Sequence, residues 1–396
     1  MKTKVTNRFA ALMMAGMLVI PSVYLSAQTD STYVPNSPQG GGEKFLLAGE
    51  VFTSYQSNKI AAFNGLPEMR NNSFGTDPLG VMVMPLVKLT DRLFLDVQFG
   101  ITANPGVGAG GGATASFNEA IIYYHVANGV NLFAGNFQPR VGLYEGILDD
   151  FTNRYCSDPV GMGISAGTQS GVGIQGGFQA GYSKVLYQFY VVNGPRLLTD
   201  SANAGLMDYS NYTDNNEGKA FGGEIGLLPF SNSSLEIGVS GQYAPTTGDA
   251  GTPFEKINNS TMAAYLNYYH TFNPLMIRVQ GQYEYTNTPN AKANPSDSAN
   301  LLPNFTNKLT GWYAGATFRL SGSSNRFLSN LELGARLGQL TLPTDAPWGG
   351  QPLNQTTVCL TYWYTWKTPI NLAYDIYTQS GMPTATSITL RGMWFF

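Results

Sequence analysis

The amino-acid sequence predicts an all-β fold, a transmembrane antiparallel β-barrel of about 16 strands. Three observations lead to this prediction. Charged residues make up only 12% of the 396 residues, whereas aromatic residues make up 13%. Apolar and polar residues alternate in many short segments, and the connections between these segments are alternately short and long. Beyond the N-terminal region no stretch has the ~18 consecutive apolar residues of a membrane helix, so a membrane-spanning chain would cross as strands.

The composition excludes several other classes of protein. The charged fraction is about half the ~25% of soluble domains, and the 46 glycines and many aromatics disfavour both disordered chains and helix bundles. A net charge of -3 gives no electrostatic footprint for nucleic acid. Only two cysteines are present, Cys156 and Cys359, which excludes a disulfide scaffold. They could pair only if the segment that carries Cys156 folds inward, and free buried thiols are the expected state.

The N-terminal residues predict a secretory signal peptide over 1–27. Lys2, Lys4 and Arg8 form a basic start, an apolar stretch follows from residue 9 to 20, and small residues precede Gln28. Residues 28–44 are then a short periplasmic segment, too short for a plug domain. Residues 45–396 form the predicted barrel.

The alternation has a period of two, which is the signal of a strand. Between Leu93 and Ile101, for example, every second residue is apolar, while Asp96 and Gln98 lie on the other face. The same pattern returns along the chain. We therefore predict strands at 45–53, 79–88, 92–103, 114–126, 130–139, 169–181, 184–193, 219–228, 234–244, 261–272, 275–286, 308–320, 327–340, 354–366, 369–379 and 384–396.

The connections between these strands sort by length. Tight turns are expected at 90–91, 127–129, 182–183, 273–274 and 367–368, and long polar segments at 54–78, 104–113, 140–168, 194–218, 245–260, 287–307 and 341–353. Short turns on one side and long loops on the other are typical of outer-membrane barrels. Aromatic residues cluster near strand ends, where their rings suit the lipid–water boundary, and the alternating last strand ends on Phe396, which resembles the insertion signal of bacterial outer-membrane barrels.

Sixteen strands in one barrel are too many for side chains to fill, and they suit a water-filled channel with apolar side chains outward and polar ones inward. Lys308 is assigned to the inward side, together with nine charged residues that we predict to line the pore: Asp96, Glu236, Arg278, Glu284, Arg319, Glu332, Arg336, Asp375 and Arg391.

Two segments resemble a known group of proteins. Residues 118–124, Asn-Glu-Ala-Ile-Ile-Tyr-Tyr, and 130–144, Val-Asn-Leu-Phe-Ala-Gly-Asn-Phe-Gln-Pro-Arg-Val-Gly-Leu-Tyr, resemble two strands and the following loop of general and phosphate-selective porins of the O/P type. This resemblance implies a sixteen-stranded, usually homotrimeric channel of the bacterial outer membrane whose third long loop folds inward and narrows the pore. By position that loop is 140–168. Its charged residues are the candidate constriction: Arg140, Glu145, Asp149, Asp150, Arg154 and Asp158.

Phosphate selectivity is not favoured, because the inward positions mix acidic and basic residues whose fields partly cancel across a wet lumen. The prediction is a porin for passive diffusion of small hydrophilic solutes or ions, without a cofactor and without enzymatic activity. Two alternatives stay open, a non-conducting barrel that acts as an adhesin or assembly partner, and a transporter of hydrophobic compounds. The polar inward positions disfavour the latter.

Three local patterns are weak. Gly163, Ser165 and Gly167 match the nucleophile-elbow spacing, but the strand–turn–helix frame is missing. The spacing of Gly171, Gly173 and Gly176 matches a dinucleotide fingerprint, but no helix surrounds it. The third pattern is a group of oxygen donors of the kind that Ca²⁺ prefers, without the spacing of a standard calcium loop: Asp208, Asp214 and Glu217.

Overall fold

The computed structural model describes residues 45–62, 67–73, 79–104, 112–143, 153–162, 164–165, 167–200, 202–289 and 305–396. The chain divides into two units, Met1–Tyr33 and Val34–Phe396, and every described residue belongs to the second. The predicted signal peptide and the segment 28–44 therefore lie outside the described residues.

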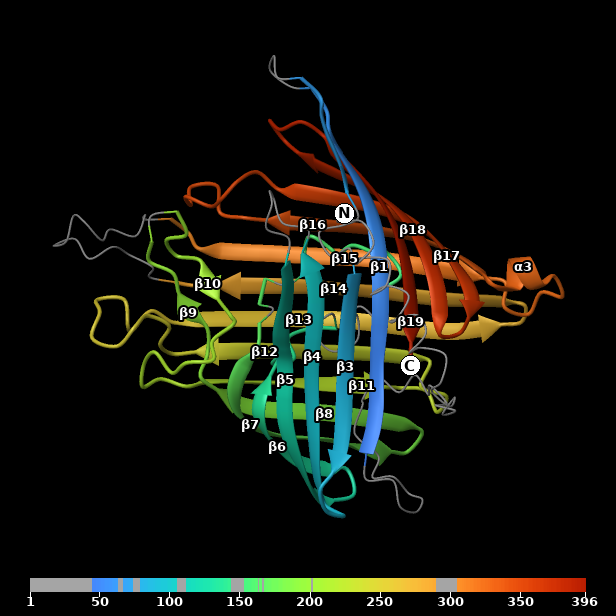
Figure 1. Cartoon of the computed structure of the whole chain (residues 1–396). Coiled ribbons are helices and arrows are strands. Elements are labelled where there is room, and N and C mark those ends of the chain that lie inside the picture. The colour runs from blue at the N-terminus through green and yellow to red at the C-terminus, as the bar shows by residue number, and fades with distance from the viewer. Residues whose placement is uncertain are drawn as a thin grey trace, which may run out of the picture. The chain divides into compact units, whose positions relative to one another are not determined.

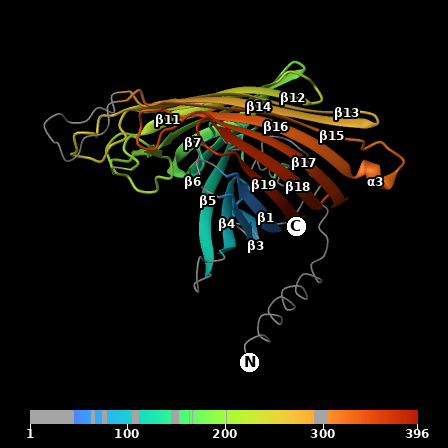
Figure 2. The ribbon, with the colours of Figure 1, turned by 90° about the horizontal axis from the view of Figure 1, so that it is seen from above.

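The strands form one antiparallel sheet that closes on itself (Figures 1 and 2). Consecutive strands pair around the ring, and β19 pairs with β1 over Glu50–Ile60, which closes it. Of the 17 strands in the sheet, the short β2 (Met69–Ser73) extends a hairpin from β1, so sixteen strands make the wall. These are β1 (Phe45–Ile60), β3 (Leu79–Lys88), β4 (Leu93–Asn104), β5 (Gly112–Ala127), β6 (Val130–Phe137), β7 (Gln169–Ala180), β8 (Ser183–Val192), β11 (Ala220–Leu228), β12 (Leu235–Ala244), β13 (Asn259–Phe272), β14 (Leu275–Asn287), β15 (Lys308–Arg319), β16 (Leu331–Thr341), β17 (Leu353–Thr365), β18 (Thr368–Gln379) and β19 (Ala385–Phe395).

Each of the sixteen predicted strands is present, which confirms the predicted fold class. The structure corrects two strand boundaries and one predicted loop. β1 continues to Ile60 and forms a hairpin with β2 inside the segment 54–78, which was predicted to be a loop. The segment 194–218 contains two short paired strands, β9 (Arg196–Leu197) and β10 (Met207–Asp208).

The third correction concerns the start of β16, which begins at Leu331 rather than at residue 327. The short helix α3 (Arg326–Ser329) precedes it. The side chain of Asn325 accepts hydrogen bonds from the backbone N–H groups of Phe327 and Leu328 and so begins the helix. This capping residue was visible in the sequence, but the apolar residues after it suggested a strand.

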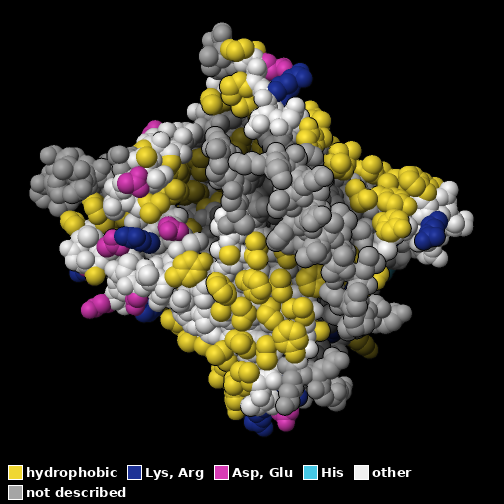
Figure 3. Space-filling model, in the orientation of Figure 1, with side chains coloured by type: hydrophobic (Ala, Val, Ile, Leu, Met, Phe, Trp, Pro, Cys, Tyr) yellow, Lys and Arg dark blue, Asp and Glu magenta, His cyan; other side chains and the backbone are white. Residues whose placement is uncertain are grey.

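The two faces of a strand differ in burial as the alternation predicts, most clearly in strands such as β12, β16 and β18. In β16, Glu332 and Arg336 are each 3% exposed, whereas the neighbouring Leu333 and Leu337 are 55% and 53% exposed. The apolar side chains therefore point away from the barrel and the polar ones into it, the reverse of a soluble protein. Figure 3 shows such apolar side chains covering the wall formed by β3, β4 and β5.

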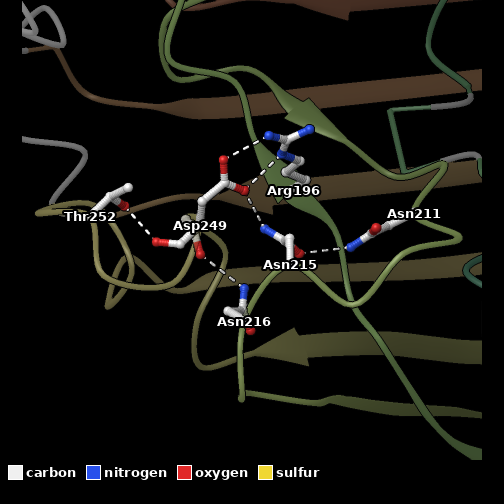
Figure 4. Close-up of polar contacts among 7 residues, drawn as sticks. Arg196, Asn211, Asn215, Asn216, Asp249 and Thr252 are labelled. Carbon is white, nitrogen blue, oxygen red and sulfur yellow. Dashed lines mark hydrogen bonds and ion pairs between the residues drawn. The ribbon is translucent and has the colours of Figure 1, made fainter.

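The connections separate the barrel into a turn end and a loop end. α3 lies at the turn end, and β9 and β10 lie at the opposite, loop end (Figure 1). Outer loops at this end, 193–219 and 245–258, contact each other: Arg196 Nη2 donates to Asp249 Oδ2 at 2.7 Å, and Asn215 Nδ2 donates to Asp249 Oδ1 at 2.9 Å (Figure 4). The same two loops share a small apolar cluster, formed by Leu197, Ala204, Phe254 and Ile257.

Within the described ranges, no helix has both the length and the apolar character that a membrane span requires.

Candidate functional site: the third loop on the inner wall

The described residues of the third loop, 140–143, 153–162, 164–165 and 167–168, lie along the inner face of the barrel. They form hydrogen bonds with inward side chains of β12, β14, β16, β17, β18 and β19. The loop begins at the end of β6, where Gly142 N donates to Ser240 Oγ at 2.7 Å and Leu143 N donates to Gln282 Oε1 at 2.6 Å. Both contacts hold the chain against the inner face of β12 and β14 directly after the end of β6.

Asp375 on β18 is the centre of the next set of contacts. Its Oδ1 accepts hydrogen bonds from Ser157 Oγ of the loop at 2.7 Å and from Thr357 Oγ1 on β17 at 2.6 Å. Gln355 Nε2 donates to the same oxygen at 3.1 Å, and Arg336 Nη2 donates to the carbonyl oxygen of Ser157 at 2.8 Å. These hydrogen bonds are removed from water, and the low local dielectric strengthens them, so they fix Ser157 on the wall.

Aromatic and guanidinium groups hold the residues before Ser157. The hydroxyl of Tyr155 donates to the carbonyl oxygens of Ala316 and Ala335 at 3.3 and 3.2 Å. The guanidinium carbon of Arg336 lies 4.6 Å from the centroid of the Tyr155 ring. The guanidinium of Arg154 lies over the ring of Trp363 on β17, also at 4.6 Å. A cation over an aromatic face is attracted most strongly when both are shielded from water, as here.

Glycines on the wall make room for the loop. A Cβ added to Gly311 on β15 would lie 2.0 Å from the carbonyl oxygen of Gly161, and one added to Gly334 on β16 would lie 3.3 Å from the Tyr155 ring. The loop backbone can therefore lie flat on β15 only because the inward residue there has no side chain.

Ser165 fastens the far end of the loop to β14. Its hydroxyl donates to Glu284 Oε1 at 2.5 Å, and both residues are buried. Ser165 is also the central residue of the nucleophile-elbow pattern. In the structure its hydroxyl makes a contact between the loop and the wall.

Three of the six candidate constriction residues are described. Arg140 lies 3.6 Å from Glu224 of β11, Arg154 stacks on Trp363, and the side chain of Asp158 is exposed. Asp158 is anchored through its backbone, because its carbonyl oxygen accepts a hydrogen bond from Gln355 Nε2 at 3.2 Å. Glu145, Asp149 and Asp150 lie outside the described residues.

The predicted pore-lining residues all occupy inward positions of their strands. Seven of the nine are buried, at 8% exposure or less: Asp96, Glu236, Glu284, Glu332, Arg336, Asp375 and Arg391. Four of these seven bind the third loop: Glu284 and Asp375 accept from loop serines, Arg336 donates to Ser157, and Arg391 donates to the carbonyl oxygen of Asn153. Glu332 instead accepts from Trp363 Nε1 at 2.8 Å. Arg278 and Arg319 are half-buried.

The inward assignment of Lys308 is wrong. Lys308 is exposed and shares the outward side of β15 with Trp312 and Phe318, whereas Leu309 is buried. The inward prediction rested on the charge of Lys308. Lys308 is the first residue of the strand, however, and from there a lysine side chain on the outward side can reach water.

The wall opposite these contacts is more apolar than the sequence suggested. The rings of Phe133 and Phe137 on β6 pack edge to face with their centroids 4.8 Å apart. The ring centroids of Phe137 and Tyr190 of β8 are 6.1 Å apart. They belong to a buried cluster with Ile121, Val192, Ala220 and Ala244. The inner face therefore has an aromatic side at β5–β8 and a polar side at β14–β19.

Burial changes the acidity of the loop residues. Removal from water lowers the pKa of the Arg154 guanidinium and raises the pKa of the Tyr155 hydroxyl. It also raises the pKa of the Cys156 thiol to about 11. All three changes are those of groups removed from bulk water.

Sequence reasoning missed most of the residues that hold the loop. Ser157, Gln282 and Gln355 are ordinary polar residues, and only contact with the loop distinguishes them from other inward side chains. One signal was present, because glycines recur at inward positions of two neighbouring strands: Gly311 and Gly315 in β15, and Gly334 and Gly338 in β16.

The described residues contain no group of three or more His, Cys, Asp or Glu side chains placed to hold a metal ion. Within the candidate calcium segment, Asp214 forms an ion pair with Lys219, and Asp208 Oδ1 accepts the backbone N–H of Ser210. These acidic side chains are therefore partnered by residues close to them in the sequence.

Comparison with known proteins places the fold. No family profile matches the sequence, and no curated protein matches it. Solved structures do match over 89% of the chain. They include the outer-membrane channel DcaP of Acinetobacter baumannii (10% identity, TM-score 0.56, 97% of that chain), OprB of Pseudomonas putida (8% identity, TM-score 0.57, 94% of that chain) and an anion-selective porin from Comamonas acidovorans (11% identity, TM-score 0.52, 99% of that chain). The chain thus has the closed sixteen-stranded barrel fold of outer-membrane porins and channels.

Proposed function

We propose that this protein is a porin of the bacterial outer membrane, through which small hydrophilic solutes or ions diffuse passively. The observation that carries the proposal is a closed ring of sixteen strands with apolar side chains outward and with the third loop fastened to its inner wall. A barrel of this strand number is wider than its side chains can fill. A chain segment inside such a barrel narrows the passage without filling it.

The apolar outer surface of the barrel supports a location in the outer membrane. An apolar outward wall needs hydrocarbon around it, and a closed sheet leaves no unpaired edge in the membrane. The turn end would then face the periplasm and the loop end the exterior. The predicted signal peptide at 1–27 would direct the chain across the inner membrane, and a trimer is the oligomeric state implied by the resemblance to porins.

Selectivity in this proposal is weak and set mainly by size. The O/P-type resemblance would permit a phosphate-selective pore, but the arginines on β16 and β19 are used to hold the loop. Asp158 keeps an exposed carboxylate on that loop. We propose that the passage takes small polar solutes of either charge. The candidate constriction is the third loop with Arg140, Arg154 and Asp158, together with Glu145, Asp149 and Asp150 by their position in the sequence.

Purified protein in a planar lipid bilayer tests the proposal. It should give stable, stepwise conductance at neutral pH, and vesicles that contain it should swell in isotonic solutions of small sugars and organic acids but not of large oligosaccharides. A folded barrel, verified by circular dichroism, that never conducts would contradict the proposal and favour the adhesin or assembly-partner alternative. Size-exclusion chromatography with light scattering in detergent separately tests the trimer.

A further inference from the structure

We propose that Cys156 and Cys359 are a disulfide-forming pair that fastens the third loop to strand β17. Cys156 lies in the loop between Tyr155 and Ser157, and Cys359 is an inward, buried residue of β17. Both thiols are free in the structure. Cys156 packs against the buried cluster of Tyr155, Cys359 and Ala373.

Contacts on both sides hold Cys156 in place. Tyr155 donates to two carbonyl oxygens of the wall, and Ser157 is bound by Asp375 and Arg336. Cys156 itself has a backbone φ of 61°, a conformation that residues with a Cβ rarely adopt. The loop is therefore fixed at the two neighbours of the cysteine, and the cysteine occupies a position where glycine would be less strained.

Small residues flank Cys359 on both neighbouring strands. Its partner on β16 is Gly334, where an added Cβ would lie 2.7 Å from Cys359 Sγ, and its partner on β18 is Ala373. The same Cβ would lie 3.3 Å from the Tyr155 ring, so the glycine leaves space next to both the wall thiol and the loop.

The chemistry is a thiol–disulfide exchange with a disulfide-containing oxidant. The Cys156 thiolate, from the more exposed residue, attacks one sulfur of the oxidant and releases the other as a thiol. The Cys359 thiolate then attacks the Cys156 sulfur of the mixed disulfide and releases the second thiol. Two cysteine thiols are oxidised to one disulfide, one oxidant disulfide is reduced to two thiols, and the two protons pass to the released sulfurs. The periplasm supplies oxidants of this class.

Burial decides when this exchange is fast. The pKa of Cys156 is raised to about 11, so little thiolate is present at neutral pH once the loop has docked. Exchange is then faster while the barrel folds and the loop settles than in the finished molecule. The disulfide acts as a permanent fastening of the loop that forms during assembly, and it does not depend on whether the barrel conducts.

Oxidative refolding of the full chain tests the pair. The reduced, unfolded protein is refolded into detergent micelles in a buffer of oxidised and reduced glutathione, then denatured with N-ethylmaleimide and measured by intact mass and non-reducing peptide mapping. We expect a product two hydrogen atoms lighter than the reduced chain, with no maleimide, and a linked peptide pair that contains Cys156 and Cys359. Folded protein that carries two maleimides, glutathione on either cysteine, or intermolecular links would overturn the proposal.

A matched control separates this geometry from simple proximity. In the double variant Cys156→Ser, Ser157→Cys, the thiol moves by one residue to the position that faces Asp375, and no link to Cys359 should form. Equal linking in this variant would contradict the proposed role of Cys156. If the double variant does not fold, the single variant Cys156→Ser serves instead, and it should leave Cys359 reduced and inaccessible to glutathione in the folded state.

Discussion

The third loop and the outer loops both connect strands of the barrel, yet their described residues are stabilised in opposite ways. The third loop is held by strand residues: Asp375 is 1% exposed and Glu284 is fully buried. The outer loops are held mainly by one another, through contacts such as the Arg196–Asp249 pair, whose side chains are 47% and 42% exposed. Buried polar groups that lose a partner are costly, whereas exposed ion pairs contribute little. Changes on the wall should therefore move the third loop, while changes among the outer loops should stay local.

The largest effect is expected from Gly311→Ala on β15. The new Cβ would lie 2.0 Å from the Gly161 carbonyl oxygen, so loop and wall must separate. Overpacking of this kind lowers the free energy of unfolding by about 1–3 kcal/mol. Urea titration of the barrel in detergent measures this loss, and single-channel conductance should change as well. Gly392→Ala is the control, since a Cβ there meets no heavy atom within 4 Å, and its stability should stay close to wild type. Equal stability of the two variants would mean that the loop does not rest on β15.

Substitution of Asp375 should have the next largest effect. In Asp375→Asn, the hydrogen bonds from Ser157, Thr357 and Gln355 lose their carboxyl acceptor, and we expect a loss of about 1–3 kcal/mol, typical of buried polar groups whose partner is removed. Hydrogen–deuterium exchange should become faster across 153–160. Asp345→Asn, an exposed residue near the loop end, is the control and should leave this exchange unchanged. Protection of 153–160 that survives the loss of Asp375 would remove that residue as the anchor.

A smaller effect, on selectivity alone, is expected from Asp158→Lys. The Asp158 side chain is exposed and the residue is anchored through its backbone, so the substitution alters the charge of the loop without detaching it. In a salt gradient the zero-current potential should shift toward anion preference. The same change at Asp345 should shift it far less, because that residue belongs to the connection 342–352 outside the barrel wall. Identical shifts in the two variants would exclude Asp158 from the constriction.

The smallest effect is expected from the outer loops. The hydrogen bonds and charge of Arg196 hold the pKa of Asp249 below its usual range. A carboxylate with a lowered pKa contributes stability above the pKa of the unfolded chain, about 3.9, and loses that contribution as the pH falls through its lowered value. Since both side chains are more than a third exposed, solvent screening limits the contribution to roughly 0.2–1 kcal/mol.

Asp249→Asn should therefore be slightly less stable than wild type at pH 7, and the difference should vanish in strong acid. Urea titrations at both pH values measure it, with conductance as the second readout, which should not change. A conductance change as large as that of Gly311→Ala would show that the outer loops control the passage.

The same comparison explains what the sequence could predict. The alternation of apolar and polar residues was enough to predict the strands. Each strand has one lipid-facing side and one inward side, and a shift of a single residue would exchange them. It placed Asp375 and Arg336 inward for the same reason. It failed where local chemistry decides: Asn325 caps a helix where a strand was expected, and Lys308 reaches outward from a strand end.

The contacts of the third loop could not be derived from the pattern. They join Ser157 to Asp375 and Ser165 to Glu284, residues far apart in the chain that meet only when the barrel has closed. The inward course of the loop came from the resemblance of 118–124 and 130–144 to porins, and the aromatic inner wall around Phe133 was not foreseen.

The position of the third loop is tested by the single-channel conductance of a variant in which a short glycine–serine linker replaces residues 145–160. If the third loop lies inside a conducting barrel, its removal should raise the conductance clearly above that of wild type in the same salt. An unchanged conductance in a correctly folded variant would contradict the account.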